Sequence, residues 1–213
     1  MRLAGRRVFA VVFGVLSLTM MLAGCGGGSP TPVTVTLVSE AGCDGHVAKF
    51  ADDSLSASPG DVRLEIGDDS NNTAYRSFVS FLLDIPPGAT IDSAVLRVYY
   101  GHLADPTHDP FSTLGPVLAD HVEYGGTLTT AAYDQPALAA LGIFSAVAPA
   151  DFVELDVTAC VRADLTASRP RSQFRLRHQN DTNADENWDM SLWESGDAVN
   201  AARRPQLIVT YTN

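Results

Sequence analysis

The sequence predicts an all-β protein, an antiparallel β-sandwich or jelly roll. Apolar runs of strand length recur along the chain and are separated by clusters of Gly, Pro, Asn and Asp. Residues 61–66 alternate strictly, with Val62, Leu64 and Ile66 on one side and charged residues on the other, as in a strand with one buried face. The chain shows no alternation of strands with long helices, so a parallel sheet is not expected.

The strongest strand signal spans residues 90–100. Ala94, Leu96 and Val98 share one apolar face of this run, and Arg97 lies on the other face. The other expected elements are strands at residues 33–38, 45–50, 61–66, 74–83, 116–124, 152–157, 174–177, 188–193 and 206–211, and short helical segments at residues 135–141 and 157–167.

The first 24 residues resemble a bacterial lipoprotein signal peptide. Three arginines make a basic start, residues 8–21 are apolar, and Leu-Ala-Gly directly precedes Cys25. The apolar run is shorter than the roughly 20 residues that a membrane-spanning helix needs. The resemblance implies cleavage before Cys25, acylation of that cysteine and anchoring in the lipid bilayer of the cell envelope. Residues 25–32 are then a Gly- and Pro-rich tether, and an outer-membrane or cell-surface position is expected.

The charge of the mature chain excludes one class of partner. Removal of residues 1–24 leaves 189 residues with 11 basic and 25 acidic side chains, a formal charge of −14. Nucleic acid is not expected as a partner, because phosphate binding needs clustered Lys and Arg. A chain of this length can bury a substantial core, and one domain is expected over residues 33–213.

Two cysteines remain after Cys25 is assigned to the lipid. Cys43 and Cys160 form a natural pair in an exported, oxidising setting, and a disulfide between them is expected to stabilise the fold by about 4 kcal/mol. The alternative is a metal-binding or catalytic thiol, but no Cys-x-x-Cys spacing or neighbouring histidine supports it.

Five segments resemble motifs of one family. Residues 76–84 (RSFVSFLLD) and 91–99 (IDSAVLRVY) are similar to the paired strands of the DNRLRE-type domain, a surface module related to carbohydrate-binding module family 96. Residues 152–158 (FVELDVT), 193–197 (WESGD) and 204–211 (RPQLIVTY) follow in the family's order. The resemblance implies a β-sandwich that binds carbohydrate, and most of these motifs are also explained by the building of a sheet.

No catalytic motif accompanies this pattern. A nucleophile elbow, a His-Glu-x-x-His helix, a Walker loop and a dinucleotide fingerprint are all missing, so the protein is not expected to be an enzyme.

No cofactor is expected, and a structural Ca²⁺ is the alternative that one loop leaves open. Asp181, Asn183, Asp185 and Asp189 place oxygen-bearing side chains at intervals in one loop, although Glu186 stands where an EF-hand requires glycine. The alternative is a polar hairpin turn. A second cluster, made of His102, Asp105, His108 and Asp109, allows either a transition-metal site or a solvated loop.

Four aromatic residues are candidates for stacking on sugar rings. Trp188 and Trp193 point to opposite faces of one expected strand, and Trp193 is predicted to be the exposed platform while Trp188 packs inward with Met190. Tyr100 and Tyr124 are further candidates.

These observations favour a lipid-anchored, non-catalytic module that binds polysaccharide or a surface glycan. Two alternatives remain at this stage. One is a structural or adhesive envelope protein with a protein partner, and the other is a polysaccharide lyase or hydrolase built on the same kind of fold.

Overall fold

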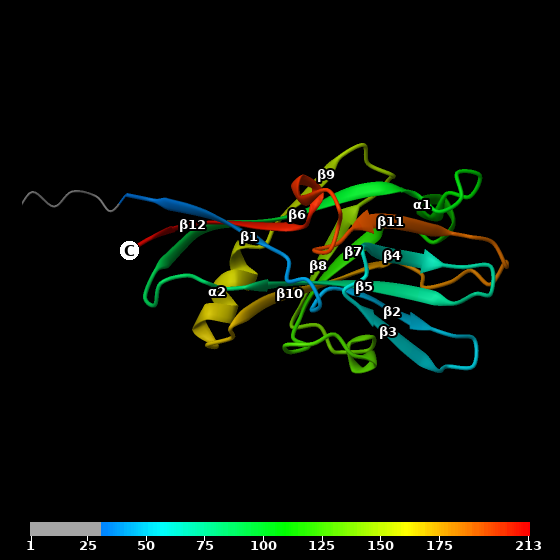
Figure 1. Ribbon diagram of the computed structural model, residues 1–213, viewed down its shortest axis with the longest axis horizontal. Helices are drawn as coiled ribbons and strands as arrows, with labels where there is room; N and C mark the ends of the chain where they lie inside the picture. The colour runs from blue at the N-terminus through cyan, green and yellow to red at the C-terminus, as the bar shows by residue number, and fades with distance from the viewer. Residues whose placement is uncertain (1–30) are drawn as a thin grey trace, which may run out of the picture.

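The computed structural model describes residues 31–213 and confirms the expected all-β fold (Figure 1). The strands are β1 (Val33–Val38), β2 (Gly45–Lys49), β3 (Leu55–Pro59), β4 (Arg63–Asp68), β5 (Ala74–Leu82), β6 (Thr90–Leu103), β7 (Val117–Val122), β8 (Ala139–Ser145), β9 (Phe152–Asp156), β10 (Arg171–His178), β11 (Met190–Glu194) and β12 (Gln206–Thr212). The helical segments are α1 (Pro110–Thr113), α2 (Thr158–Thr166) and the short 3₁₀ turns η1 (Thr130–Ala132) and η2 (Ala201–Arg203).

Strand β6 connects the two layers of the sandwich. Its first half pairs with β12 and β9, and its second half pairs with β11, in both cases antiparallel. The strands follow the order β1-β12-β6-β11-β4-β5-β10-β7-β8, with the β2–β3 hairpin attached to β5. The sheet therefore curls over on itself, and its two halves face each other across the core (Figure 1).

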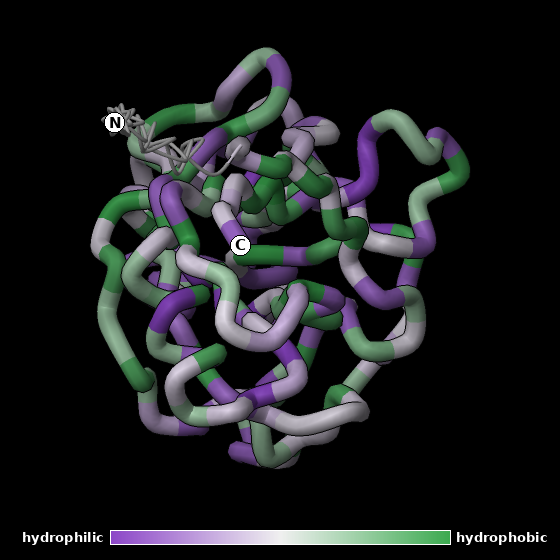
Figure 2. Tube along the Cα trace, turned by 90° about the vertical axis from the view of Figure 1, so that its left-hand side faces the viewer, coloured by the Kyte–Doolittle hydropathy of each residue, from purple (hydrophilic) through white to green (hydrophobic). Residues whose placement is uncertain are grey.

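The core lies between these halves and contains the face that the sequence pattern identified. Ala94, Leu96 and Val98 of β6 are fully buried, as are Phe174 of β10 and Trp193 of β11. Hydrophobic and hydrophilic residues alternate along much of the chain, as Figure 2 shows from the end that carries α2. This alternation keeps the outer faces polar while the inner faces exclude water.

The two ends of the sandwich are different. Helix α2 packs at one end, where the Arg162 guanidinium donates to the Ile91 carbonyl oxygen at 2.9 Å (Figure 1). The loops that join β2 to β3, β4 to β5 and β10 to β11 gather at the opposite end. We call this opposite end the loop end. Within residues 31–213, no helix has the length and hydrophobicity needed to cross a bilayer.

Two expectations about local structure are wrong. Residues 135–141 are not helical, because the chain from Ala139 onward pairs with β7 as strand β8. The alanine-rich run favours a helix locally, but pairing with the free edge of β7 outweighs that preference. Strand β3, formed by Leu55–Pro59, was not expected either, and it pairs with β2. Helix α2 confirms the second expected helical segment.

The predicted disulfide is wrong in this structure, since Cys43 and Cys160 are both free. The Cys43 thiol lies in the segment between β1 and β2 and donates to the Gly126 carbonyl oxygen at 3.1 Å. Cys160 lies on α2 and is buried in the core. The signal peptide, Cys25 and most of the tether lie outside the described residues.

Candidate functional site

The outer face of the sheet carries a row of polar and aromatic side chains that crosses four strands. Arg63 of β4 pairs with Glu194 of β11, and Tyr99 of β6 pairs with Phe152 of β9. The β11–β6 register, with Trp193 opposite Tyr100, places Glu194 beside Tyr99.

We call Arg63, Glu194, Tyr99 and Phe152 the outer row. Their sequence neighbours Leu64, Trp193 and Val98 are fully buried, so the row itself points away from the core. Three strand spacings make the row about 14 Å wide, enough to face more than one ring of an oligosaccharide.

Two arginines lie on the aromatic rings of the outer row. The Tyr99 and Phe152 rings meet edge to face, with centroids 5.2 Å apart. The Arg203 guanidinium carbon lies 4.5 Å from the Tyr99 ring centroid, and that of Arg97 lies 4.3 Å from the Phe152 centroid. Such pairs are worth about 0.5–1 kcal/mol each at exposed sites, so they orient the guanidinium groups without locking them in place.

Charged and amide groups surround the two arginines. Arg97 is 2.7 Å from a Glu154 carboxylate oxygen and donates to the Gln206 side-chain oxygen at 3.1 Å. Arg203 lies 3.9 Å from the Glu194 carboxylate, and its side chain is 45% exposed. The surface thus offers carboxylates, an amide and guanidinium groups around two rings, the combination that sugar hydroxyls and apolar sugar faces can contact.

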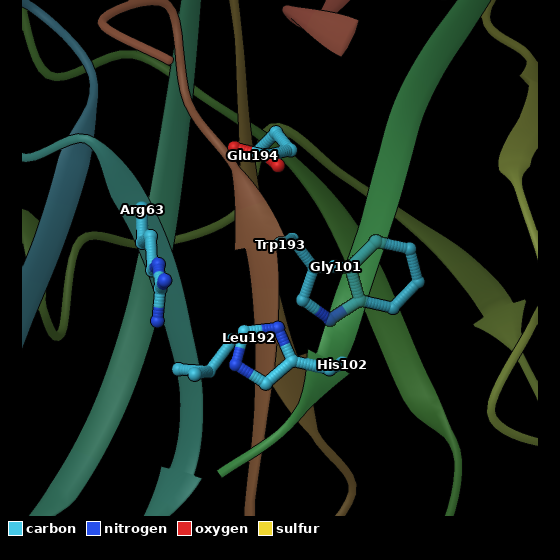
Figure 3. Close-up of a pocket in the computed structure, with 6 residues that line it drawn as sticks. All are labelled: Arg63, Gly101, His102, Leu192, Trp193 and Glu194. Atoms are coloured by element: carbon cyan, nitrogen blue, oxygen red, sulfur yellow. The ribbon is translucent and has the colours of Figure 1, made fainter. Parts of the chain in front are cut away.

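A pocket opens beside the outer row and is shown in Figure 3. Arg63, His102 and Leu192 surround it, and its volume of about 30 Å³ can accept a hydroxyl group or one water molecule. Gly101 is needed here, because a Cβ at this position would lie 2.9 Å from the Leu192 carbonyl oxygen, where β6 and β11 shift register.

A further pocket adjoins this one along the same surface. This neighbouring pocket of about 300 Å³ shares Arg63 and Glu194 and extends to Arg203. Val62 and Val199 line it and are 49% and 95% exposed. The two pockets together form a shallow groove with polar walls and apolar contacts, and the outer row runs beside it.

A third pocket, of about 250 Å³, lies at the loop end. Lys49, Phe50 and Tyr133 line it together with Asp181, and Phe50 is 41% exposed. The Arg76 guanidinium organises this region, since it contacts Asp181 at 2.6 Å and lies 4.0 Å from the centroid of the Tyr133 ring. Burial alone lowers the pKa of Arg76, but the bond to Asp181 raises it overall. We call this the loop-end pocket.

The aromatic residues predicted for sugar stacking mostly serve other purposes. The prediction that Trp193 is exposed is wrong, because its ring is fully buried. Tyr100 is also buried, and it packs edge to face on Trp193 with centroids 5.1 Å apart. Tyr124 is half-buried and donates to the Cys43 carbonyl oxygen at 3.1 Å. Trp188, predicted to be buried, is 45% exposed because β11 begins only at Met190.

The predicted calcium ligands divide into two groups. Asn183, Asp185 and Asp189 come together, because the Asn183 amide donates to Asp185 at 2.9 Å and to Asp189 at 2.7 Å. Asp181 points elsewhere and pairs with Arg76. Among residues 31–213, no three His, Cys, Asp or Glu side chains converge as a metal-binding group, so the cluster of residues 102–109 does not form one.

The sequence contained a signal for part of the outer row. Alternation along β6 places Tyr99 on the face opposite the core, together with Arg97, which lies on the Phe152 ring, but the motif that contains both residues is also explained by the building of a sheet. Arg63, Phe152 and Arg203 come from distant parts of the chain, and only the strand pairing places them around Tyr99.

Comparison with known proteins agrees with this architecture. The model of carbohydrate-binding module family 96 matches residues 56–211, which include every residue of the outer row. The search of curated proteins gave no match.

Proposed function

Because the chain belongs to carbohydrate-binding module family 96, we propose that its β-sandwich is a non-catalytic module that binds polysaccharide along the outer row. The observation that carries this proposal is the pair of edge-to-face rings, each with a guanidinium on its face, on the outer side of β6 and β9.

The outer row fits a sugar chain better than the loop-end pocket does. It is long, open and next to a groove, so a polymer can pass across it without its ends being enclosed. Guanidinium and carboxylate groups can bond hydroxyl groups, and the Tyr99 and Phe152 rings can contact the apolar faces of sugars once Arg203 or Arg97 moves aside. The exposed Arg203 side chain has the freedom to do so.

We also propose that Cys25 is acylated and anchors the module to the cell envelope, at the outer membrane or cell surface. The support is the order of basic residues, apolar run and Leu-Ala-Gly-Cys at the start of the sequence. Metabolic labelling with a fatty acid should mark the wild-type protein, and Cys25→Ser should remove the label. Labelling of the serine variant would contradict the proposal.

A polysaccharide screen tests the proposed binding directly. The purified chain is applied to a glycan array and to native gels that contain individual soluble polysaccharides, and retention of at least one polysaccharide is expected. Retention of none would contradict carbohydrate binding and favour a structural or adhesive role with a protein partner. Release of new reducing or unsaturated sugar ends would instead show that the protein is an enzyme.

Two matched variants locate the site. Arg203→Ala removes the guanidinium that lies beside Tyr99 and Glu194 of the outer row and is expected to weaken binding about tenfold, or about 1.4 kcal/mol. Lys49→Ala removes a positive charge from the loop-end pocket and is expected to leave binding unchanged. The opposite result, loss with Lys49→Ala alone, would move the site to the loop-end pocket.

A further inference from the structure

Two buried carboxylates lie opposite each other where β4 and β11 reach the loop end. Met190 pairs with Gly67, and at the next position the Asp68 N–H donates to the Asp189 carbonyl oxygen at 3.0 Å. Directly opposite residues of an antiparallel pair point to the same face, so the two side chains lie next to each other. Asp68 is 1% exposed and Asp189 is 0% exposed. A Cβ on Gly67 would collide with the Asp189 carbonyl oxygen, so only glycine permits this approach.

Each of the two carboxylates has one oxygen without a partner. Asp68 Oδ1 and Asp189 Oδ1 are buried and accept no hydrogen bond. The other oxygens are bound by the same residue, since Asp68 Oδ2 accepts from the Asn183 N–H at 3.4 Å and Asp189 Oδ2 accepts from the Asn183 side-chain amide at 2.7 Å. A buried charged oxygen without a partner is costly, and two like charges side by side add repulsion. A bound cation would remove both penalties.

From this arrangement we propose that Asp68 and Asp189, together with Asn183 of the β10–β11 loop, form a Ca²⁺ site. No third carboxylate converges on this pair within residues 31–213, so main-chain oxygens and water complete the coordination. The side chains supply only oxygen and amide groups, which suit a hard cation and not zinc. Ca²⁺ accepts six to eight oxygens in flexible geometry and takes carboxylates, amide and main-chain carbonyl groups and water together.

Asn183 links the loop to both Asp68 and Asp189. The Asn183 side-chain nitrogen donates to the Asp185 and Asp189 carboxylates, and its Oδ1 accepts from the Asp185 N–H at 3.1 Å. A half-turn of this amide gives up these bonds and turns its oxygen toward a cation held by Asp68 and Asp189, without any movement of the backbone. Asp68 is the ligand that the loop sequence could not reveal, because it comes from a strand 115 to 121 residues away from Asn183 and Asp189 in the chain.

A shared proton is the competing explanation for the two carboxylates. Burial raises the pKa of Asp68, and the nearby Asp189 and Asp185 carboxylates raise it as well. A proton would satisfy the pair at low pH without any metal. The two explanations differ in what they predict at neutral pH, where only the cation explanation requires Ca²⁺.

Calcium titration of the chelator-treated full chain is the test. Isothermal titration calorimetry with CaCl₂ is expected to show binding at one site, and the Trp188 fluorescence is expected to change because Trp188 adjoins Asp189. Ca²⁺ at a hundredfold excess over its Kd should raise the Tm by about 5–10 °C. MgCl₂ at the same concentration should have a much smaller effect, because Mg²⁺ demands stricter geometry.

Variants identify the ligands. Asp68→Asn and Asp189→Asn are each expected to abolish the Ca²⁺-dependent rise in Tm and to increase the Tm of the metal-free protein, because each removes one of two repelling charges. Asp181→Asn is the control, since this residue lies in the same loop but pairs with Arg76. It should keep the calcium response. Absence of heat and of any Tm change in the wild-type protein would overturn the proposal, as would an unaltered calcium response in both Asp68→Asn and Asp189→Asn.

Discussion

Raising the pH from about 6 to about 10 is expected to weaken the attachment of α2 to the sheet. His121 of β7 lies 2.9 Å from Asp164 of α2, and their side chains are 3% and 0% exposed. Burial alone lowers the pKa of His121, but its bonds to Asp164 and Cys160 raise the value to about 9. The imidazolium is therefore kept in the folded protein at pH values at which an unfolded chain has lost its proton.

The difference between a pKa of about 9 and the ordinary value of 6.5 corresponds to about 3 kcal/mol of folding free energy. Below pH 6.5 both states carry the proton, and the full contribution is present. Between pH 6.5 and pH 9 only the folded state keeps it, so stability falls as the pH rises. Above pH 9 the contribution is lost. A loss of this size is a large part of the 5–15 kcal/mol typical of a domain.

Urea unfolding at several pH values measures the effect. The free energy of unfolding of the wild-type protein is expected to fall by about 3 kcal/mol over this range. In Asp164→Asn the partner carboxylate is gone, burial dominates, and the pKa of His121 should drop below 6.5. Stability of that variant should then fall at low pH, the opposite direction. His108→Gln is the control, because His108 is partly exposed and pairs with Asp105 in a surface loop.

Direct titration of the histidine ring signals by NMR decides whether this reasoning holds. A His121 pKa at or below 6.5 in the folded protein would refute it. The reasoning would also fail if Asp164→Asn showed the same decline of stability with rising pH as the wild-type protein.

Three further predictions concern the aromatic and cysteine residues. Tyr99→Ala should weaken polysaccharide binding by about 2 kcal/mol, or roughly thirtyfold, in titration calorimetry. Tyr99→Phe should retain most of the binding. Equal losses in both variants would show that the hydroxyl group, not the ring, makes the contact. In urea unfolding, Trp193→Ala should destabilise the fold by about 3–5 kcal/mol, whereas Trp188→Ala should destabilise it by no more than about 0.5 kcal/mol. A larger loss of stability in Trp188→Ala than in Trp193→Ala would contradict the buried position of Trp193. Mass spectrometry without reductant should find Cys43 and Cys160 as two free thiols, and a mass two hydrogens lower would show that they are joined.

Strand positions could be read from the sequence because each depends on local chemistry. Strand β1 occupies the expected residues 33–38, and β6 contains the expected run and extends beyond it to Leu103. Period-two alternation and turn residues act within a few positions of each other, so no knowledge of distant partners is needed. The helix predicted at residues 135–141 is wrong because the conformation there depends on a distant partner, the free edge of β7.

The direction of side chains was harder to predict than the strands themselves. Alternation shows that adjacent residues of a strand point to opposite faces, but it does not show which face another layer will cover. The sequence placed Trp188 inside and Trp193 outside, whereas β11 begins after Trp188 and directs Trp193 between Leu64 and Tyr100. Both residues carry the same ring, so the start of β11 at Met190, and not the size of the side chain, decides which of them is buried.

The sequence alone determined the class of fold, the order of most strands, the family resemblance and the loop with closely spaced oxygen-bearing side chains. Only the tertiary structure decided that Cys43 and Cys160 remain apart, that the outer row assembles around Tyr99, and that Asp68 joins Asp189. The physical reason is the same in each case. Local pattern depends on neighbouring residues, whereas these contacts depend on which strands pair, and pairing is set by burial and hydrogen bonding across the whole sheet.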